Sequence, residues 1–236
     1  VIALNQDSLG MQAEVIERGK DYLILSKTIQ KREGKLRAVA LYNRSNVIKK
    51  IRVDFDKLYL SGKVQVRDLW NHQETGTFTE YYETLVPAHG TALIRLEGSK
   101  RHDRICYEAE YAFMQEYLPD NKQMAHFAYK AGASGDYIMK RLGNSPSNWA
   151  EFRKVYVSKG GEYQLKITYF SGDKRDIQIA VNESEYKQSG LCSGAWDQAA
   201  ITTVKVKLHK GYNTIRLYNS NGWAPDIDKM EISKSR

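Results

Sequence analysis

The chain has 236 residues, a formal net charge of +8 and a mean hydropathy of -0.59. This length suffices for one large domain or two ordinary ones, and the absence of any run of roughly 20 apolar residues argues against membrane insertion. The positive charge is spread along the sequence without a dense block of Lys and Arg, so solvated strand faces are a better interpretation than a nucleic-acid groove.

The first part of the chain alternates apolar and polar residues over short segments separated by turn-rich pieces. This pattern predicts strands over residues 22–28, 36–42, 51–55, 64–70, 77–86 and 91–96. Short strands at this spacing favour an antiparallel β-sandwich. We expect Trp70, at the end of the fourth strand, to lie in the core of this sandwich.

The sequence turns polar and basic between residues 97 and 106 (EGSKRHDRIC), and we place a linker at residues 99–104. The alternation then resumes and predicts strands over residues 106–114, 152–157, 163–170, 176–182, 202–208, 212–219 and 226–232. The prediction is an all-β chain with two antiparallel β-sandwich domains in tandem, residues 1–98 and residues 105–236.

The N-terminus and the cysteines bear on the compartment in which the protein works. The chain begins with Val and lacks the basic region of a signal peptide, so we expect it to be a fragment of a longer polypeptide. Cys106 and Cys192 fit one disulfide, if the chain is secreted, or two buried free thiols equally well.

Four stretches of the first domain resemble the C-terminal sandwich of glycoside hydrolase family 27, the α-galactosidase family. They are VIALNQDSLG (1–10), ALYNRS (40–45), LSGKVQVRDLWNHQETGTF (60–78) and VPAHGTALIRL (86–96). The resemblance implies a small Greek-key sandwich that follows a catalytic barrel carrying both catalytic carboxylates. We therefore expect no hydrolysis by this chain alone, and an α-galactosidase-like parent enzyme that degrades polysaccharides.

The second domain resembles the carbohydrate-binding modules of families 35 and 6. The resemblance is carried by YEAE (107–110), GASGDYI (132–138), the run 151–169, AWD (195–197) and GYNTIRLYNSNGWAPDIDKMEI (211–232). It implies a lectin-like jelly-roll sandwich that binds a galactoside or a uronic-acid-containing glycan. It also implies an extracellular, cell-surface or periplasmic location.

Two pairs of carboxylates raise a question of charge. Asp226 and Asp228, like Glu108 and Glu110, stand two residues apart in predicted strands, where like charges on one face oppose folding unless a cation or hydrogen bonds compensate them. In the modules just named, acids at these places bind a structural Ca²⁺. We assign Glu108, Glu110 and Asp228 as calcium ligands, with carbonyls of residues 129–134 as helpers.

Two other interpretations of these acids compete with a calcium site. In the first, the acids are solvated and paired with Lys and Arg. In the second, they are the general acid and base of a glycosidase. Adjacent acids on one strand face cannot flank a sugar, which argues against the second. Asp226 is left either to hydrogen-bond the turn after Pro225 or to approach a ligand.

A sugar site needs a flat aromatic side chain and polar groups on loops. Five residues meet this description or are implied by the resemblance, with the recognition Asn at or near Asn221: Tyr137, Trp196, Asp197, Asn221 and Trp223. The competing interpretation has Trp196 covering the end of the sandwich, Tyr137 in the core, and a structural or protein-docking module without sugar binding.

Overall fold

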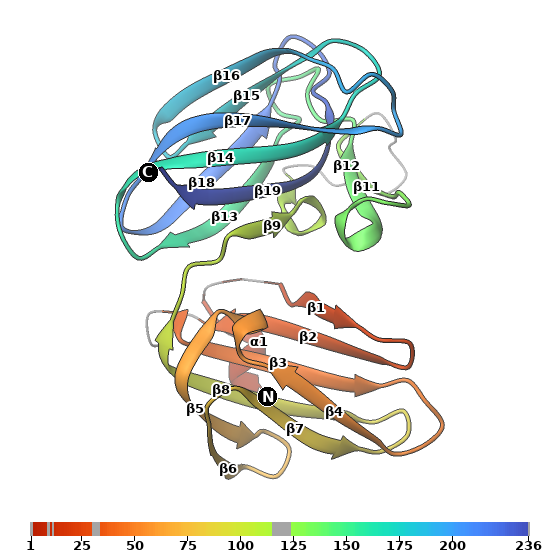
Figure 1. Ribbon diagram of the computed structural model, residues 1–236, viewed down its shortest axis with the longest axis vertical. Coiled ribbons are helices and arrows are strands. Elements are labelled where there is room, and N and C mark those ends of the chain that lie inside the picture. The colour runs from red at the N-terminus through yellow and green to blue at the C-terminus, as the bar shows by residue number, and fades with distance from the viewer. Residues whose placement is uncertain (1, 9, 11, 30–33, 115–123, 236) are drawn as a thin grey trace. The chain divides into compact units, whose positions relative to one another are not determined.

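The computed structural model describes residues 2–8, 10, 12–29, 34–114 and 124–235. The chain divides into two compact units, Val1–His102 and Asp103–Arg236 (Figure 1). Both are built almost entirely from antiparallel strands, which confirms the predicted all-β class. The boundary falls within the expected linker, although residues 99–101 of that stretch continue the last strand of the first unit.

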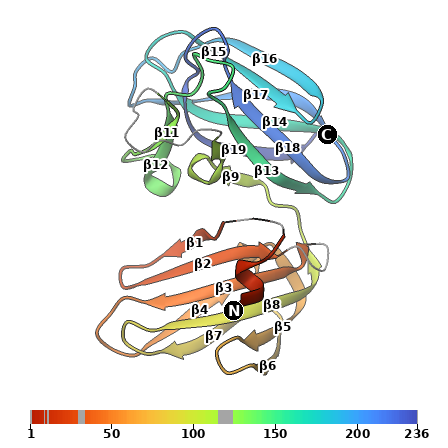
Figure 2. The same cartoon turned by 180° about the vertical axis from the view of Figure 1, so that it is seen from behind.

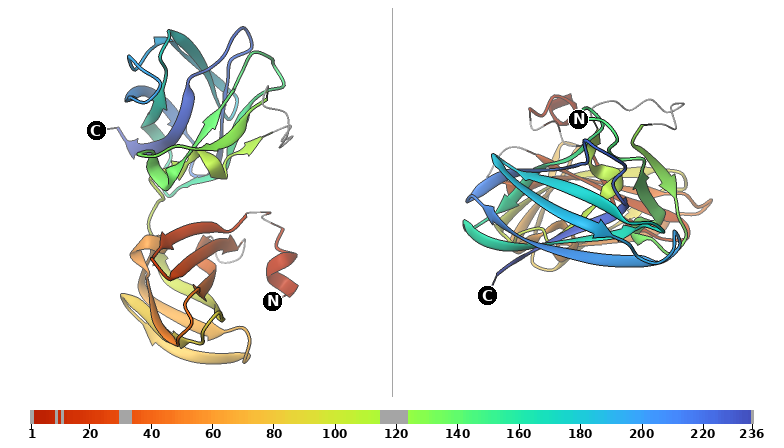
Figure 3. Two further views of the ribbon diagram at one scale, coloured as in Figure 1. Left: turned by 90° about the vertical axis from the view of Figure 1, so that its right-hand side faces the viewer. Right: turned by 90° about the horizontal axis from the view of Figure 1, so that it is seen from above.

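The first unit has a six-stranded sheet in the order β1-β2-β3-β8-β5-β6 and a separate pair, β4-β7, seen from behind in Figure 2. Its elements are α1 (Ile2–Asn5), β1 (Glu14–Arg18), β2 (Tyr22–Ile29), β3 (Leu36–Asn43), β4 (Lys49–Asp54), the 3-10 turn η2 (Asp56–Leu58), β5 (Leu60–Asp68), β6 (Gln73–Phe78), β7 (Tyr81–Val86) and β8 (Thr91–Arg101). Figure 3 shows α1 beside the strands, where Leu4 packs against Ile29, Leu36 and Ala38.

The core of the first unit lies between these two groups of strands. Alternate residues of β4 and β7, such as Ile51, Val53 and Val86, are buried against Val39 and Ile94 of the larger sheet. The alternation of apolar residues in the sequence therefore marks the buried face, as a half-buried strand requires.

Two expectations for the first unit are wrong. The segment 77–86 is not one strand: it bends at residues 79–80, so β6 pairs with β5 while β7 pairs with β4. Trp70 is 56% exposed rather than buried. The Asp68 carboxylate accepts hydrogen bonds from the amides of Trp70 and Asn71, which ends β5 in a turn and carries the indole out of the core.

The second unit is a sandwich of a five-stranded sheet, β10-β13-β18-β15-β16, and a six-stranded sheet, β11-β12-β19-β14-β17, with β9 added beside β19. Its strands are β9 (Cys106–Glu108), β10 (Phe113–Met114), β11 (His126–Tyr129), β12 (Tyr137–Lys140), β13 (Ala150–Val157), β14 (Gly161–Phe170), β15 (Arg175–Val181), β16 (Ser184–Leu191), β17 (Ala199–Leu208), β18 (Gly211–Tyr218) and β19 (Asp226–Lys234). Two 3-10 turns, η3 (Ala109–Tyr111) and η4 (Ser134–Asp136), complete it.

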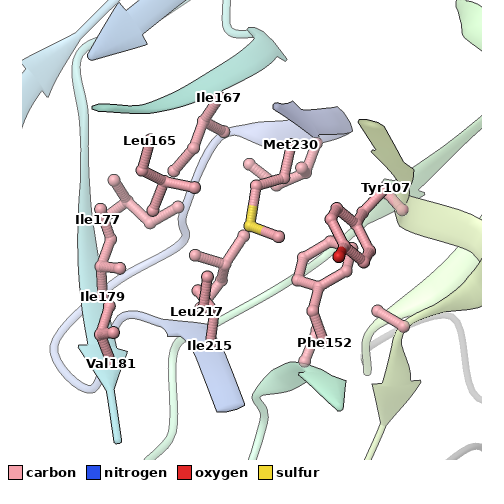
Figure 4. Close-up of a cluster of buried hydrophobic side chains, with 14 of the residues drawn as sticks. Tyr107, Phe152, Leu165, Ile167, Ile177, Ile179, Val181, Ile215, Leu217 and Met230 are labelled. Atoms are coloured by element: carbon pink, nitrogen blue, oxygen red, sulfur yellow. The ribbon is translucent and has the colours of Figure 1, made fainter. Parts of the chain in front are cut away.

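The core of the second unit is formed where the inward faces of the two sheets meet. Figure 4 shows side chains of β15 and β18, among them Ile179 and Leu217, directed toward Leu165 of β14 and Met230 of β19. Each of these four side chains is fully buried. The inward residues of each strand are used for packing. Candidate ligand-binding groups are therefore sought on the loops at the strand ends.

One predicted strand of this unit is wrong in a way that affects the site. Residues 106–114 do not form a continuous strand: β9 ends at Glu108, and Glu110 lies in the 3-10 turn η3. Glu108 and Glu110 therefore do not alternate along one strand. Instead, the turn redirects Glu110 relative to β9.

Candidate functional site

The first group of candidate residues surrounds a β-bulge in the last strand. Thr168 of β14 pairs with Lys229 and Tyr169 pairs with Ile227, so Asp228 is the additional residue of β19. On its other side β19 pairs with β9, where Glu108 stands opposite Lys229. A bulge re-aims side chains locally, and here it brings Asp228 and Glu108 to the same end of the sandwich.

The three predicted metal ligands converge on the turn η4. The amide of Ser134 donates to Asp228 Oδ1 at 2.9 Å, and the hydroxyl of Ser134 donates to Glu108 Oε1 at 2.8 Å. Gly135, with φ of +64°, leaves room for Glu110, because a Cβ at this glycine would lie 2.6 Å from Glu110 Oε1. Residues from β9, η3 and β19 thus meet at two consecutive residues of one loop.

The electrostatics of Asp228 are unfavourable in the absence of a cation. Burial raises the pKa of Asp228 to about 6, and the negative charge of Glu108 acts in the same direction, whereas the Ser134 amide lowers it. Glu108 Oε2 is buried and accepts no hydrogen bond from the residues that the structure describes. Carboxylates under these conditions favour an added positive charge.

The side chains around Ser134 offer oxygen atoms of the types that a hard cation accepts, although the described carboxylates are not arranged as a metal cluster. Within the described ranges, no group of three or more His, Cys, Asp and Glu side chains is arranged to hold a metal ion. Ca²⁺ accepts hydroxyl and carbonyl oxygens as well as carboxylates, at six to eight positions. Ser134 and the backbone of its loop supply oxygens of that type beside Glu108, Glu110 and Asp228.

Asp226 has a different environment although it lies two residues from Asp228. Its side chain is 6% exposed, and its Oδ2 lies 3.7 Å from Lys140 Nζ. Burial raises the pKa of Asp226, while the charges of Lys140, Arg175 and Lys130 and a hydrogen bond from the Arg141 amide oppose that rise. Asp226 is thus compensated by basic groups of this chain.

The second group of candidate residues lies on two loops joined by Arg175. Trp196 is 44% exposed, and the guanidinium carbon of Arg175 lies 4.4 Å from the centroid of the Trp196 ring. Arg175 Nη1 also donates to the carbonyl oxygen of Ala224 at 3.1 Å. Arg175 therefore links the 192–197 loop to the loop that contains Asn221 and Trp223.

The 219–224 loop is held from inside. The amide side chain of Asn219 donates to the carbonyl oxygen of Asp176, and its Oδ1 accepts from the amide of Asn221. Gly143, with φ of +93°, allows close approach, because a Cβ there would lie 2.5 Å from the carbonyl oxygen of Gly222. This packing leaves Asn221 exposed and Trp223 half-buried.

The remaining candidates differ in position. Asp197 is exposed beside Trp196. Tyr137 is 42% exposed, not in the core, and its ring contacts that of Tyr129 at 6.1 Å between centroids. Among the described residues, no contact joins Tyr137 to Trp196 or Asn221, so the structure brings together the two loops and leaves Tyr137 with β11.

Comparison with known proteins identifies the first unit. Residues 20–96 match the family model described as the alpha galactosidase C-terminal beta sandwich domain. The first unit is an α-galactosidase C-terminal β-sandwich domain. A probable alpha-galactosidase of Dictyostelium discoideum is 33% identical over 102 residues, which are 41% of this chain and 26% of that protein. The chain thus spans about a quarter of the length of this curated relative.

Two solved structures are similar to this chain. A family 35 carbohydrate binding module from Clostridium thermocellum is 28% identical, with a TM-score of 0.49, over 54% of this chain and 97% of that one. The isomalto-dextranase of Arthrobacter globiformis T6, complexed with panose, is 21% identical, with a TM-score of 0.55, over 92% of this chain and 37% of that one. At this identity the second likeness concerns the fold alone, and it continues past the α-galactosidase C-terminal sandwich into the second unit.

The contacts by which three residues position the sites were not predicted from the sequence, although Ser134 belongs to the segment 129–134 whose carbonyls were expected to help hold calcium. Ser134, Arg175 and Asn219 lie outside the recognised acidic and aromatic patterns, and their contacts depend on loops brought together by the fold. Only Arg175 had a local signal, since Asp173 stands two residues before it and pairs with its Nε. The sequence contains no marker for the partners across loops.

The two cysteines, for which a disulfide and free thiols were both open, are free. The expectation that free thiols would be buried is wrong, because Cys192 is exposed and Cys106 is half-buried. Burial raises the pKa of the Cys106 thiol to about 11, with a further contribution from Glu108. The Cys106 thiol is therefore protonated at neutral pH.

Proposed function

We propose that this chain is the noncatalytic C-terminal part of an α-galactosidase-like glycoside hydrolase and that its second unit binds a glycan. The observation that carries the binding proposal is the exposed Trp196 on a loop fixed beside the Asn221 loop. A half-exposed indole presents an apolar plane for the C–H face of a pyranose. Asn221 and Asp197, both exposed, supply polar groups for sugar hydroxyls.

We infer that the ligand is a galactoside or a uronic-acid-containing glycan. The axial hydroxyl of galactose leaves one face of the ring continuously apolar, which suits stacking on Trp196. Lys140, whose side chain is 42% exposed, provides positive charge beside Asp226, which suits a carboxylate-bearing sugar. Tyr137 and Trp223 are secondary candidates for contacts at the periphery of such a ligand.

The first unit has a structural role in this proposal. The family resemblance assigns the catalytic carboxylates to a barrel preceding the α-galactosidase C-terminal sandwich, so the sandwich would support that barrel. The second unit would hold substrate near the active site and raise its effective concentration. Polysaccharide substrates of this kind lie outside the cytoplasm, and we propose an extracellular, cell-surface or periplasmic location for the parent enzyme.

A structural Ca²⁺ completes the proposal. Glu108, Glu110 and Asp228 would hold the ion with oxygens of the Ser134 loop, and the ion would supply the positive charge that these acids lack. The ion would tie the first strand, the turn η3 and the last strand of the module together. It takes no part in sugar chemistry here.

The membrane is not a partner in this proposal. None of the described helices is long and apolar enough to cross a bilayer. Association with polysaccharide through the second unit would instead localise the parent enzyme on its substrate.

Calorimetric titration tests sugar binding. The chain is titrated with galactose, an α-galactoside oligomer and a uronic acid, with calcium and after chelation. We expect saturable binding that is lost in Trp196→Ala and Asn221→Ala. Trp70→Ala is the matched control, because Trp70 is also an exposed indole, at 56% against 44% for Trp196, and belongs to the other unit.

The same experiment decides between sugar binding and a structural or docking module. Saturable heat with any of the three sugars supports a lectin site, and the best ligand indicates the substrate of the parent enzyme. The absence of heat with all three, in a sample whose melting temperature still falls on chelation, would reject the lectin site and retain the calcium sandwich.

A further inference from the structure

Arg175 occupies the junction of three segments of the second unit. Its Nε donates to Asp173 Oδ1 at 2.6 Å, and its Nη1 donates to the carbonyl oxygen of Ala224 at 3.1 Å. Its guanidinium carbon lies 4.4 Å from the centroid of the Trp196 ring. The Arg175 side chain is only 17% exposed, so these contacts are made in a partly desolvated position where they are stronger than at the surface.

The Trp196 ring is held at an edge as well as on a face. A Cβ at Gly172 would lie 2.6 Å from Trp196 Nε1, so the indole passes directly over this glycine. The loop before Trp196 is fixed to the same turn, since Ser193 donates through its amide to the carbonyl oxygen of Ser171 and the Ser171 amide donates to Ser193 Oγ. Despite this restraint, Trp196 remains 44% exposed.

We propose that Arg175 is a positioning residue for the sugar site. It lies against one face of Trp196, leaves the remaining surface of the indole to the ligand, and fixes this plane relative to the Asn221 loop through Ala224. The inference rests on the proposed glycan binding and adds a residue that need not touch the sugar. It explains how an exposed indole on a loop keeps one orientation before the ligand arrives, which lowers the entropy cost of binding.

The shape of arginine is required for this role. A planar guanidinium can stack on the indole while its in-plane N–H groups donate to Asp173 and to Ala224, in two different directions. The ammonium group of a lysine can make a charged contact with Asp173, but it has no plane to lay on the ring. Substitution by lysine therefore keeps the charge and removes the alignment.

The molecule contains a matched control in another Arg–Trp pair. The Arg216 guanidinium lies 4.1 Å from the centroid of Trp149, and Arg216 is joined to Glu151 by an ion pair of 2.7 Å. Arg216 lies on β18, and Trp149 directly precedes β13. Within the part of the chain that the structure describes, neither residue contacts the Trp196 loop or the Asn221 loop. Arg216→Gln thus removes the same type of stacking without touching the proposed site.

The orientation of Trp196 is measured without any sugar. The indole N–H signals of the chain are recorded by nuclear magnetic resonance, and each is assigned from its loss in the corresponding Trp→Phe variant. We expect Arg175→Gln to shift or broaden the Trp196 signal and to leave the Trp70 signal unchanged. Arg216→Gln is expected to change the Trp149 signal alone.

Affinity is measured next, by calorimetry with the sugar that binds the wild-type chain best. We expect Arg175→Gln and Arg175→Lys to weaken binding roughly tenfold, the size of one desolvated cation–π contact with its hydrogen bonds. Asp173→Asn, which removes the anchor of the guanidinium, should weaken binding by a smaller factor and covers the case in which Arg175 variants fold poorly. Melting temperatures of all variants are recorded in parallel.

The outcomes separate this inference from the proposed function. A wild-type chain that binds no sugar rejects the proposed function, and the inference with it. A wild-type chain that binds, with Arg175→Gln or Arg175→Lys showing the same affinity and an unchanged Trp196 signal, overturns the inference and leaves the lectin site intact. Weakened binding in Arg175 and Asp173 variants, with Arg216→Gln unaffected, supports it.

Discussion

Asp226 and Asp228 lie two residues apart on β19, are equally buried, and have opposite electrostatic surroundings. Basic groups, led by Lys140, oppose the rise that burial causes in the pKa of Asp226. Around Asp228 the nearest strong influence after the Ser134 amide is the negative charge of Glu108. Basic groups of the chain thus compensate Asp226, whereas at Asp228 the opposing charge of Lys229 is offset by the acids Glu108 and Glu231. This difference is the reason for proposing a cation at Asp228 and not at Asp226.

The largest effect on stability should come from adding calcium, and this effect should depend on Asp228 and not on Asp226. An ion present at about a thousand times its dissociation constant stabilises a fold by roughly 4 kcal/mol. We expect calcium to raise the melting temperature of the wild-type chain and of Asp226→Asn, and to have little effect on Asp228→Asn. The measurement is differential scanning calorimetry with calcium and with a chelator.

Magnesium serves as the control for this experiment. Its preference for a small octahedral shell makes it a poor substitute in a site of carboxylates and loop carbonyls. Equal stabilisation of all three proteins by calcium, or equal stabilisation by both ions, would contradict the assignment of Asp228 as a ligand.

Truncation in the calcium-free protein should give the next largest effect, with a different result at each position. Asp226→Ala leaves Lys140 and the Arg141 amide without their buried acceptor, and we expect a loss of about 2 kcal/mol. Asp228→Asn removes a charge repelled by Glu108, so its unfolding free energy should be unchanged or slightly higher. Urea denaturation in the presence of a chelator measures both, and a greater loss in Asp228→Asn would reverse the comparison.

Two glycines of the loop between β11 and β12 test whether Glu110 is a calcium ligand. Gly135 and Gly132 both have positive φ, of +64° and +86°, but only Gly135 faces an atom, Glu110 Oε1, at 2.6 Å from a built Cβ. Each Ala variant should lose about 1 kcal/mol through backbone strain. Gly135→Ala should also displace Glu110 and reduce the stabilisation by calcium. Calcium stabilisation equal in both variants would show that Glu110 is not a ligand.

The sequence anticipated the fold more completely than the sites. Alternation located β2, β3, β8 and most strands of the second unit, because half-buried strands repeat every two residues. It failed at residues 79–80 and at Ala109–Tyr111, where the chain changes partner or direction within a run of strand-forming residues. Such breaks are set by pairing with distant strands, which local propensity does not encode.

For the sites, residue type was predictable and partnership was not. The acids Glu108, Glu110 and Asp228 were noticed because like charges in predicted strands need an explanation, and Trp196 because an aromatic residue in a polar loop does. Ser134 contacts Asp228, which is 94 positions away in the sequence, and Arg175 contacts Trp196, which is 21 positions away. Only the folded loops make these pairs, so single-sequence patterns could not reveal them.

The smallest expected effect concerns a third buried carboxylate, Glu151, which extends the comparison to acid pH. Burial raises the pKa of Glu151, but hydrogen bonds and charges from Arg153 and Arg216 outweigh it and hold the pKa below its ordinary value of 4.5. A lowered pKa contributes stability that is present above pH 4.5 and is lost as the pH falls through the native value. Because both arginines are more than 40% exposed, we expect no more than about 1 kcal/mol. Glu151→Gln should therefore be less stable than the wild-type chain at pH 7, and this difference should shrink as the pH falls below 4.5. Urea denaturation measures it, with Glu162→Gln on the exposed face of β14 as the matched control. A difference in unfolding free energy between Glu151→Gln and the wild type that stays constant with pH would mean that packing of the Glu151 side chain, and not its charge, connects the two arginines. Countercharge from the chain would then not be what distinguishes Asp226 and Glu151 from Asp228.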